Sequence, residues 1–390
     1  MDTSNAFVGL DCMATGDRHG PDHVGRSDAD APLDPVYDLD AVDPGTLPTD
    51  PDSMWDYHAL LPVHADDAVS AGEGATPLLD ADDLAADLGV ASVQLKDEGR
   101  NPTGSIFDRG QSAAVTMARA HGAGLLALAA PGDAGQSAAA YAGRSGTDCY
   151  AYLPSRAPFP NKAMVNVHGA DMRVIGGRYP DALDALESDL AREWYSLQAF
   201  TTPYRHDAYR TLAYEVAAAR DWTTPDAVVL AVGTGETLVG VAHGFHDLDA
   251  LGLTDGVPRC YAVQPEGCAP IVEAHGAGAD EVTPVEYPDT ICGELEIPAP
   301  EGGTMALDAI DETAGGAITV ADEDLLESAV ALTQRLGTEV GATGGAAAAG
   351  AWALADRGDL GTDDSVLVVN ADAGVKTADI LRSHLMSQGV

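Results

Sequence analysis

Three glycine-containing loops carry the residue types from which an anion site can be built. They are Asn101–Gly110 (NPTGSIFDRG), Ala130–Ser137 (APGDAGQS) and Gly233–Thr237 (GTGET). Each lies between an apolar run and a segment with helical character, so its backbone N–H groups would lie at a helix start, where α/β proteins bind anions. One such loop is a weak signal. Three of them in this order and spacing predict a functional site.

The elements that must position these loops alternate between short apolar runs and longer helical segments. Runs such as 125–129 (LLALA) predict strands buried on both faces of a parallel sheet. The predicted strands are 93–95, 125–129, 149–153, 172–175, 196–200, 228–232, 260–264 and 365–370, with helices between them. The Ala- and Gly-rich segment 341–355 predicts a tightly packed helix. The fold class is therefore α/β.

The order of these segments predicts two domains behind an N-terminal arm. Residues 1–65 are rich in Asp, Pro and Gly and have one apolar anchor, 54–63 (MWDYHALLPV), which predicts a short helix. We expect residues 66–107 and 218–390 to form the larger domain. Residues 108–217 are expected to form a smaller, inserted α/β domain.

The composition excludes several classes of partner. The 390 residues include 62 acidic and 20 basic side chains, a formal net charge of -42, and a field of this sign repels nucleic acids and anionic lipids. We therefore expect small molecules or other proteins as partners. Because 45% of the residues are apolar, the chain should nevertheless fold around real cores.

The charge pattern also bears on the location of the protein. Many acids beside only three lysines are typical of a surface adapted to molar salt, where self-repulsion is screened, so we expect a halophilic protein. No stretch approaches the ~20 apolar residues of a membrane span and the N-terminal sequence lacks an export signal, which predicts a cytoplasmic location. The five cysteines are too scattered for a disulfide framework, which predicts free thiols.

Longer motifs carry a resemblance to a known family. They are GEGATPLL (72–79), LKDEGRNPTGS with DRG (95–110), NKAMVNVHGAD (161–171), TLAYEV (211–216), AVGTGETLVG (231–240) and NADAGVK (370–376). In this order the chain resembles threonine synthase and related fold-type II pyridoxal-phosphate enzymes. The resemblance implies two three-layer parallel-sheet domains of tryptophan synthase beta-like architecture and a homodimer. It also implies a zinc-ribbon-like start of the arm, but Cys12 alone remains of four thiols, which predicts no metal site.

The lysine on which the family's chemistry depends is missing from the matching position. The family motif is GSFKDRG, in which the lysine forms a Schiff base with pyridoxal phosphate and then moves protons. The matching segment here is GSIFDRG, with Phe107 in the lysine position. Phenylalanine has no amine, so it can form no imine and cannot act as a base. Lys96, Lys162 and Lys376 each match a family lysine of another purpose, so none is spare.

Other binding positions that the resemblance implies also depart from the family pattern. The family's S-[TS]-G-N loop is APGD here, which loses hydroxyls and an N–H group and gains a carboxylate at Asp133. Glu236 stands where the phosphate loop has Gly or Asn, and it would repel a phosphate dianion. Asn370 lies near the position of a Ser or Thr that bonds the pyridine nitrogen. The degenerate cofactor positions are Asp133, Gly233, Thr234, Gly235, Glu236, Thr237 and Asn370, and the degenerate substrate positions are Ser105, Ala130, Pro131 and Gly132.

These departures lead to a pseudoenzyme as the first hypothesis: a threonine-synthase-like protein without covalently bound pyridoxal phosphate. It would bind a ligand or regulate an active paralogue. Two alternatives stay open. The chain could be an active threonine synthase or related lyase that holds pyridoxal phosphate non-covalently, with Asp133 or Glu236 as the base. It could also be a structural or interaction protein whose cleft is closed by Phe107.

Overall fold

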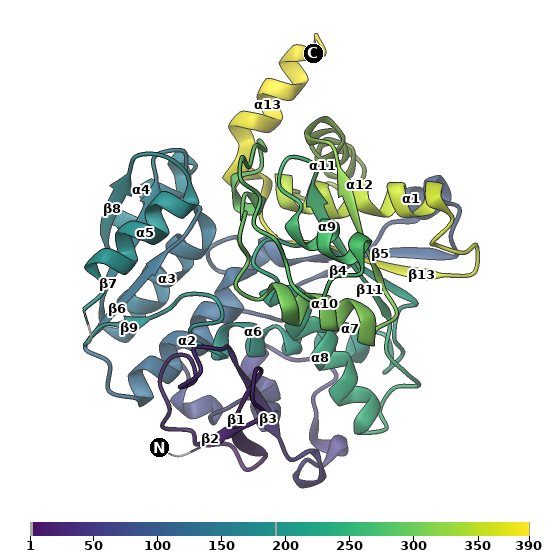
Figure 1. Cartoon of the computed structure of the whole chain (residues 1–390). Helices are drawn as coiled ribbons and strands as arrows, with labels where there is room; N and C mark the ends of the chain where they lie inside the picture. The colour runs from purple at the N-terminus through teal and green to yellow at the C-terminus, as the bar shows by residue number, and fades with distance from the viewer. Residues whose placement is uncertain (1–2, 192, 390) are drawn as a thin grey trace. The chain divides into compact units, whose positions relative to one another are not determined.

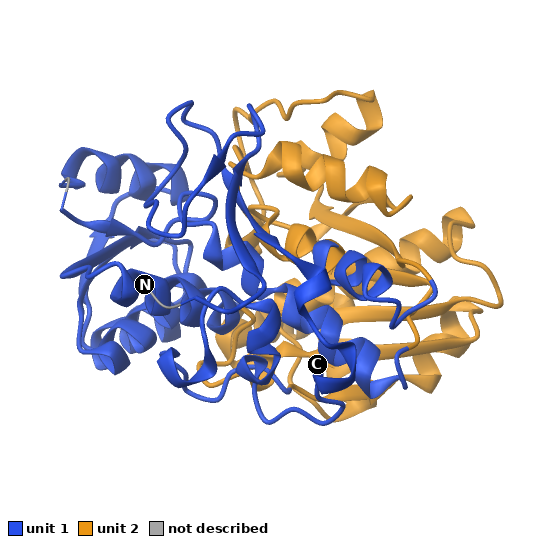
Figure 2. Ribbon diagram, turned by 90° about the horizontal axis from the view of Figure 1, so that it is seen from below, with its two compact units in different colours: residues 1–75, 107–222, 243–255 blue, residues 76–106, 223–242, 256–390 orange. Residues whose placement is uncertain are grey.

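The computed structural model describes residues 3–191 and 193–389. The chain forms two compact units (Figure 2), and each contains a sheet whose strands are mostly or all parallel. Unit 1 consists of residues 1–75, 107–222 and 243–255, and unit 2 consists of residues 76–106, 223–242 and 256–390. The N-terminal 65 residues, expected as an arm, are thus part of unit 1. The chain passes from one unit to the other several times.

The parallel sheet of unit 1 has the strand order β8-β7-β6-β9. Its strands are β6 (Leu125–Ala129), β7 (Asp148–Pro154), β8 (Asp171–Ile175) and β9 (Tyr195–Ser196), and the helices of the unit are α2 (Phe107–Ala120), α3 (Asp133–Ser145), α4 (Phe159–Val167), α5 (Tyr179–Asp189), α6 (Tyr204–Ala208) and α7 (Arg210–Ala219). Leu126 and Leu128 share a core with α2 and α3, whereas Ala127 and Ala129 pack with α5. Figure 1 shows α3 and α5 beside this sheet. Both faces of β6 are covered, which explains why LLALA is apolar throughout.

The N-terminal part of unit 1 contains strands that the sequence pattern did not predict. β1 (Phe7–Cys12), β2 (Arg18–His19) and β3 (Leu33–Tyr37) form an antiparallel sheet of order β2-β1-β3. Strands this short and polar show little alternation of apolar residues, so the pattern missed them. The helix expected at 54–63 is a 3-10 helix, η3 (Met54–Leu60), which the Ser53 hydroxyl caps. Shorter 3-10 helices of this part are η1 (Leu39–Ala41), η2 (Pro44–Thr46) and η4 (Ala65–Asp67).

The sheet of unit 2 has the order β12-β11-β10-β13-β5-β4, and β4 is its one antiparallel strand. Its strands are β4 (Leu78–Asp80), β5 (Ser92–Asp97), β10 (Ala227–Ala231), β11 (Arg259–Pro265), β12 (Gly316–Val320) and β13 (Ser365–Asn370). Because β10 and β13 are parallel neighbours, the loops at their carboxyl ends share one edge of the sheet. The sequence prediction missed β4 and β12, and it made the strand at 196–200 too long, since β9 ends at Ser196.

Helices cover the unit 2 sheet and include one that is packed closely, as the sequence predicted. The helices of unit 2 are α1 (Asp82–Leu88), the first part of α8 (Glu236–Ala250), α9 (Pro270–Ala277), α10 (Gly303–Glu312), α11 (Asp322–Leu336), α12 (Ala342–Arg357) and α13 (Ala378–Ser387), with 3-10 helices η5 (Glu98–Arg100), η6 (Gly293–Leu295) and η7 (Gly374–Thr377). Of these, α13 packs against α11 and not against the sheet. In α12, Gly345 contacts the Leu325 carbonyl oxygen and Gly350 contacts Val263. A side chain at either glycine would collide with these neighbours.

A separate observation concerns membranes. None of the helices formed by the described residues combines the length and the apolar character that crossing a bilayer requires.

Candidate functional site

The loop between β10 and α8 lies at the carboxyl edge of the unit 2 sheet. Gly235 has a φ of +97°, a backbone conformation that favours glycine, and α8 begins at the next residue, Glu236. The first turn of a helix leaves backbone N–H groups without helical partners, so the loop has the geometry of an anion site. Glu236 is only 1% exposed. Its carboxylate therefore lies within the protein and not in water.

Other parts of unit 2 pack closely around this loop. A Cβ atom on Gly233 would lie 3.1 Å from the Glu294 carbonyl oxygen, and one on Gly235 would lie 3.1 Å from Ala306 Cβ and 3.2 Å from the Gly302 carbonyl oxygen. The segment around η6 and the start of α10 thus restricts the space at both glycines. Glu294 is itself buried, so the surroundings of the loop are rich in oxygen acceptors.

The ends of β5 and β13 meet at the same edge of the sheet. The Asn370 side chain is buried, and its Nδ2 donates to Asp97 Oδ1 at 2.8 Å and to the Glu339 carbonyl oxygen at 3.1 Å. Ser105 forms an isolated bridge with Asp372, just past the end of β13. The structure therefore brings the predicted positions Ser105 and Asn370 into the same part of unit 2 as the loop after β10.

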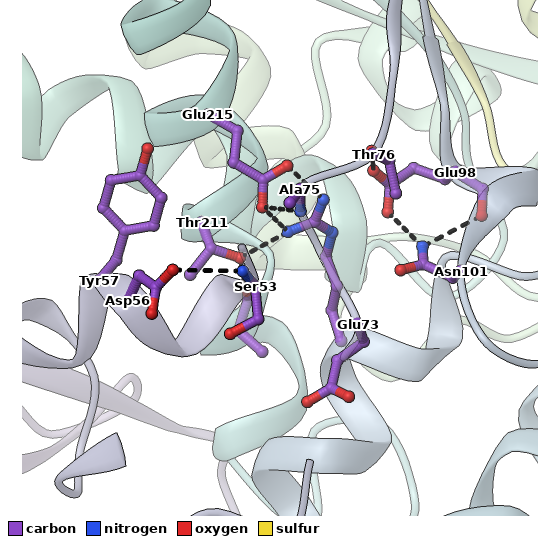
Figure 3. Close-up of polar contacts among 12 residues, drawn as sticks. Ser53, Asp56, Tyr57, Glu73, Ala75, Thr76, Glu98, Asn101, Thr211 and Glu215 are labelled. Carbon is purple, nitrogen blue, oxygen red and sulfur yellow. Dashed lines mark hydrogen bonds and ion pairs between the residues drawn. The ribbon is translucent and has the colours of Figure 1, made fainter. Parts of the chain in front are cut away.

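Two of the three lysines belong to unit 2 and are buried. Lys96 Nζ donates to the Thr76 carbonyl oxygen at 2.7 Å, which ties β5 to the segment before β4. The Thr76 hydroxyl donates to Glu98 Oε1 at 2.5 Å, and Asn101 Nδ2 donates to Glu98 Oε2 at 2.8 Å (Figure 3). Lys96 and Glu98 thus connect the motif LKDEGRN to Thr76, and Glu98 also fixes Asn101 within the motif. Lys376 lies in η7, after β13.

In unit 1, Phe107 is the first residue of α2. Its half-buried ring packs against the core formed by α2, α3 and the sheet. The Arg205 guanidinium lies over this ring, 5.9 Å from the ring centroid, which is within the range of a cation–π contact. Arg205 also donates to the Leu197 carbonyl oxygen at 2.8 Å. Apolar packing and a cation therefore surround Phe107 at the start of this helix.

The predicted substrate loop 130–133 lies at the carboxyl end of β6, directly before α3. Asp133 is the first residue of α3 and is buried, so it is not a solvated loop acid. Asn161 Nδ2 on α4 donates to Asp133 Oδ1, and a carboxylate at this position also interacts favourably with the helix dipole. Ala130 is fully buried. The starts of α2 and α3 belong to one core, so the structure brings Phe107 and this loop together within unit 1.

A buried ion pair joins two of the recognised motifs of unit 1. Arg109 of the DRG motif donates to both carboxylate oxygens of Glu215 in the TLAYEV motif, at 2.6 and 2.8 Å, and to the Thr211 hydroxyl at 3.0 Å. Glu215 Oε1 also accepts from the Ala75 N–H at 2.9 Å (Figure 3). Arg109 in DRG and Glu215 in TLAYEV are buried charges that satisfy each other through this bidentate pair.

Glu73 of the GEGATPLL motif is a second buried acid of unit 1 (Figure 3). Its carboxylate accepts from Trp55 Nε1, the Ala71 N–H and the Tyr141 hydroxyl, each at 2.8 Å, and from the Ser112 hydroxyl. Burial, followed by the negative charges of Asp108 and Glu73, raises the pKa of Tyr141 well above its ordinary value. Tyr141 therefore acts as a hydrogen-bond donor.

A further set of charged residues in unit 1 surrounds Arg210, and we call it the Arg210 cluster: Asp34, Tyr37, His206, Asp207, Arg210, Tyr214, His243 and Asp247. Arg210 contacts Asp207 Oδ1 and Asp247 Oδ2, both at 2.9 Å, and donates to His243 Nδ1 at 3.2 Å. Tyr37 of β3 donates to Asp207 Oδ2 at 2.6 Å. The cluster thereby fastens the N-terminal sheet to α6 and α7. Sequence reasoning missed it, because its members come from segments far apart in the chain.

Burial dominates the protonation of this cluster. It raises the pKa of Asp207 to about 6, against the opposing effect of Arg210. It lowers the pKa of His243 to about 4, against the opposing effect of Asp34. His206 Nε2 lies 2.9 Å from Asp34 Oδ1. At neutral pH Asp207 is therefore ionised and His243 is neutral.

Cys12, the one thiol left of the family's zinc-ribbon positions, is the last residue of β1. Cys12 is buried and hydrogen-bonded to the Ser27 hydroxyl at 3.2 Å. Hydrogen bonds from Ser27, and then from Thr15, lower its pKa to about 7. No group of three or more His, Cys, Asp or Glu side chains among the described residues could hold a metal ion. All five cysteines are free, as the sequence predicted.

Comparison with known proteins gives this geometry its context. Residues 69–372 match the family described as "Pyridoxal-phosphate dependent enzyme". The chain is 34% identical to a threonine synthase of Methanosarcina acetivorans over 92% of this chain and 90% of that one, and 31% identical to a threonine synthase of Methanocaldococcus jannaschii over 84% and 81%. A fungal L-serine ammonia-lyase from Rhizomucor miehei has the same fold, with a TM-score of 0.67 at 21% identity over 79% of this chain and 97% of that one. The chain therefore belongs to the fold-type II pyridoxal-phosphate dependent enzymes and, among them, to the threonine synthase family.

Proposed function

We propose that this chain is a threonine-synthase-like pseudoenzyme that holds no covalently bound pyridoxal phosphate and has a ligand-binding or regulatory role. The observation that carries the proposal is Phe107 at the start of α2, where the family motif has its lysine. Pyridoxal phosphate, when bound, supplies an electron sink that stabilises a carbanion. Without an amine at residue 107, this chain has no group there to hold the cofactor covalently or to move a proton.

The residues at the other family positions do not fit the cofactor either. Buried carboxylates at Asp133 and Glu236 lie where the family binds a substrate carboxylate and a phosphate. An anion beside a buried carboxylate is repelled strongly, because little water screens the two charges. The Asn370 amide already donates to Asp97 and to the Glu339 carbonyl oxygen. Like the phenylalanine at position 107, these residues disfavour binding of the cofactor.

No lysine offers an obvious replacement for the missing amine. Lys96 and Lys376 are buried in unit 2, and the Lys96 amine donates to the Thr76 carbonyl oxygen. Lys162 lies in α4 of unit 1, where its amine donates to the Ser155 carbonyl oxygen at 2.8 Å. The amines of Lys96 and Lys162 thus have places in the local structure, and Lys376 also takes part in polar interactions. This supports a role of the three lysines in packing and folding.

The test is an absorbance and mass-spectrometric titration with pyridoxal phosphate in molar potassium chloride, with and without borohydride. We expect the spectrum of free cofactor and no stoichiometric pyridoxyl adduct after reduction. Lys162→Arg is the matched control, because this lysine is the most accessible and could react non-specifically. A stoichiometric adduct on Lys96 or Lys376 in this variant would refute the proposal.

A second candidate is an active threonine synthase that holds pyridoxal phosphate non-covalently. The observation that favours it is 34% identity to a threonine synthase over 92% of the chain. Asp133 or Glu236 would then have to act as the base. Threonine formation from O-phosphohomoserine, dependent on added cofactor and abolished by Asp133→Asn or Glu236→Gln, would favour this candidate over the pseudoenzyme.

The proposed role also includes a protein partner. We propose that the chain forms a homodimer or associates with an active paralogue, in a cytoplasm of high salt. The acidic composition supports a protein or small-molecule partner over a nucleic acid. Light scattering of the purified chain in molar potassium chloride, alone and with an active threonine synthase from the same cell, measures both associations.

A further inference from the structure

The missing lysine does not decide whether the loop Gly233–Thr237 can still bind a phosphate group. A phosphate-binding loop uses backbone N–H groups at a helix start, so the loss of an amine elsewhere leaves its donors in place. This loop keeps its glycines, its turn and the start of α8. Its one unusual member is Glu236, a carboxylate placed inside the protein at the first helical residue.

We propose that Glu236 is the built-in anion of this loop and that it makes the loop reject phosphate-bearing ligands. The proposal rests on the proposed function in one respect, namely that the loop corresponds to the family's phosphate position. It goes further in assigning the rejection to one residue of unit 2. Glu236 is thus a specificity-determining residue that excludes phosphate-bearing ligands from the loop.

Burial of Glu236 carries the first step of the argument. A carboxylate that is 1% exposed has lost its water and needs hydrogen-bond donors or a cation inside the protein. Glu236 does take part in polar interactions. The helical hydrogen bonds of α8 begin with the Val239 N–H, which donates to the Gly235 carbonyl oxygen at 3.0 Å. The N–H groups before Val239 are therefore the donors closest to Glu236 along the chain, and the helix dipole favours an anion there.

The surroundings of the loop carry the second step. The carbonyl oxygens of Glu294 and Gly302 lie 3.1 and 3.2 Å from the positions that Cβ atoms on Gly233 and Gly235 would occupy. These oxygens are the negative ends of their peptide dipoles, and the Glu294 side chain is buried as well. A phosphate dianion held by the N–H groups of the loop would lie beside the Glu236 carboxylate, in a loop whose packing neighbours are themselves acceptors. The loop can thus stabilise the single negative charge of the Glu236 carboxylate. It cannot stabilise the two charges of a phosphate dianion in addition.

The experiment titrates the folded full-length chain with inorganic phosphate by calorimetry, at constant ionic strength in potassium chloride. Glu236→Asn removes the charge and shortens the side chain, whereas Glu236→Gln removes the charge alone. Glu323→Asn is the matched control, because Glu323 is an exposed acid in the first turn of α11 in the same unit. We expect no saturable binding of millimolar phosphate by the wild type or by Glu323→Asn, and at least tenfold tighter binding by Glu236→Asn.

Each outcome of this titration decides the matter. Phosphate binding by both Glu236→Gln and Glu236→Asn supports the proposal, because both variants lack the charge. Binding by Glu236→Asn but not by Glu236→Gln overturns it, because the length of the side chain and not its charge would then close the loop. Equal binding by the wild type, by Glu323→Asn and by Glu236→Asn overturns it, as does the absence of binding in a Glu236→Asn variant with native circular dichroism. The proposed function fails by a different result, a reducible lysine adduct in the wild type, which the phosphate titration does not report.

Discussion

Replacing His243 by Asn tests whether the Arg210 cluster holds a neutral histidine. Burial lowers the pKa of His243 from 6.5 to about 4. Because the pKa of His243 is lower in the folded state than in the unfolded state, the unfolded state takes up a proton first as the pH falls. The free energy of unfolding is therefore lowered as the pH falls from 6.5 toward 4, and this loss is absent above pH 6.5. The asparagine side-chain oxygen can accept the hydrogen bond from Arg210 Nη2, which His243 Nδ1 accepts at 3.2 Å.

The magnitude follows from the distance between the two pKa values. Each pKa unit corresponds to about 1.4 kcal/mol, so at pH 5 the unfolded wild type gains about 2 kcal/mol by protonating this histidine. His243→Asn removes that gain. We expect the free energy of unfolding of the variant, relative to the wild type, to rise by about 2 kcal/mol between pH 8 and pH 5.

The wild type alone would not reveal this effect. The raised pKa of Asp207, about 6, lets the folded state take up a proton over nearly the same pH range in which the unfolded state protonates His243. The two contributions have opposite signs and largely cancel. Only the difference between variant and wild type isolates the histidine.

The assay is urea denaturation in constant molar potassium chloride at pH 8, 6 and 5. The matched substitution is His275→Asn on α9, which tests whether removal of any histidine has this effect. A difference between His243→Asn and the wild type that stays constant from pH 8 to pH 5 would refute the reasoning, because His243 would then have the same pKa folded and unfolded.

Three further predictions concern the ion pair, the lysine position and metals. Arg109→Met should cost about 3–5 kcal/mol in urea denaturation, because it leaves the buried Glu215 carboxylate unpaired, and adding Glu215→Leu should recover part of that loss; full additivity of the two changes would contradict the pairing. Phe107→Lys alone should not restore threonine formation from O-phosphohomoserine, since Asp133 and Glu236 still oppose bound anions; threonine formation at the rate of an active threonine synthase would show that these acids do not matter. Excess EDTA should leave the thermal unfolding midpoint unchanged, as expected without a metal-ligand cluster in the described residues; a lowered midpoint that zinc restores would contradict this.

Local sequence patterns predicted the elements around the site well. The strand expected at 125–129 is β6 (Leu125–Ala129), because a strand buried on both faces must be apolar throughout. The glycine at 235 indicated the turn before α8, since its φ of +97° is unfavourable for other residues. The small residues of 341–355 indicated a helix that neighbouring chain approaches closely.

Contacts between distant segments could not be predicted in the same way. Asp34 and His206 are 172 positions apart, and their pairing leaves no periodic trace in the sequence. The small sheet of β1, β2 and β3 was missed for a related reason, since its strands rely on cross-strand pairing more than on an apolar pattern. Asp133 was not predicted to be buried, because its partner Asn161 lies on another helix.

Asp133 and Glu236 share a position that stability alone explains poorly. Each is the first residue of a helix, α3 in unit 1 and α8 in unit 2, and each is buried. A carboxylate at a helix start gains about 0.3–1 kcal/mol from the dipole, but Glu323 of α11 receives that benefit while remaining exposed. A buried carboxylate needs donors as well, and a loop that gives its donors to its own side chain has fewer for a ligand. Buried acids at the same kind of position in two separately packed units therefore support the proposed loss of an anionic substrate and cofactor over two unrelated gains in stability.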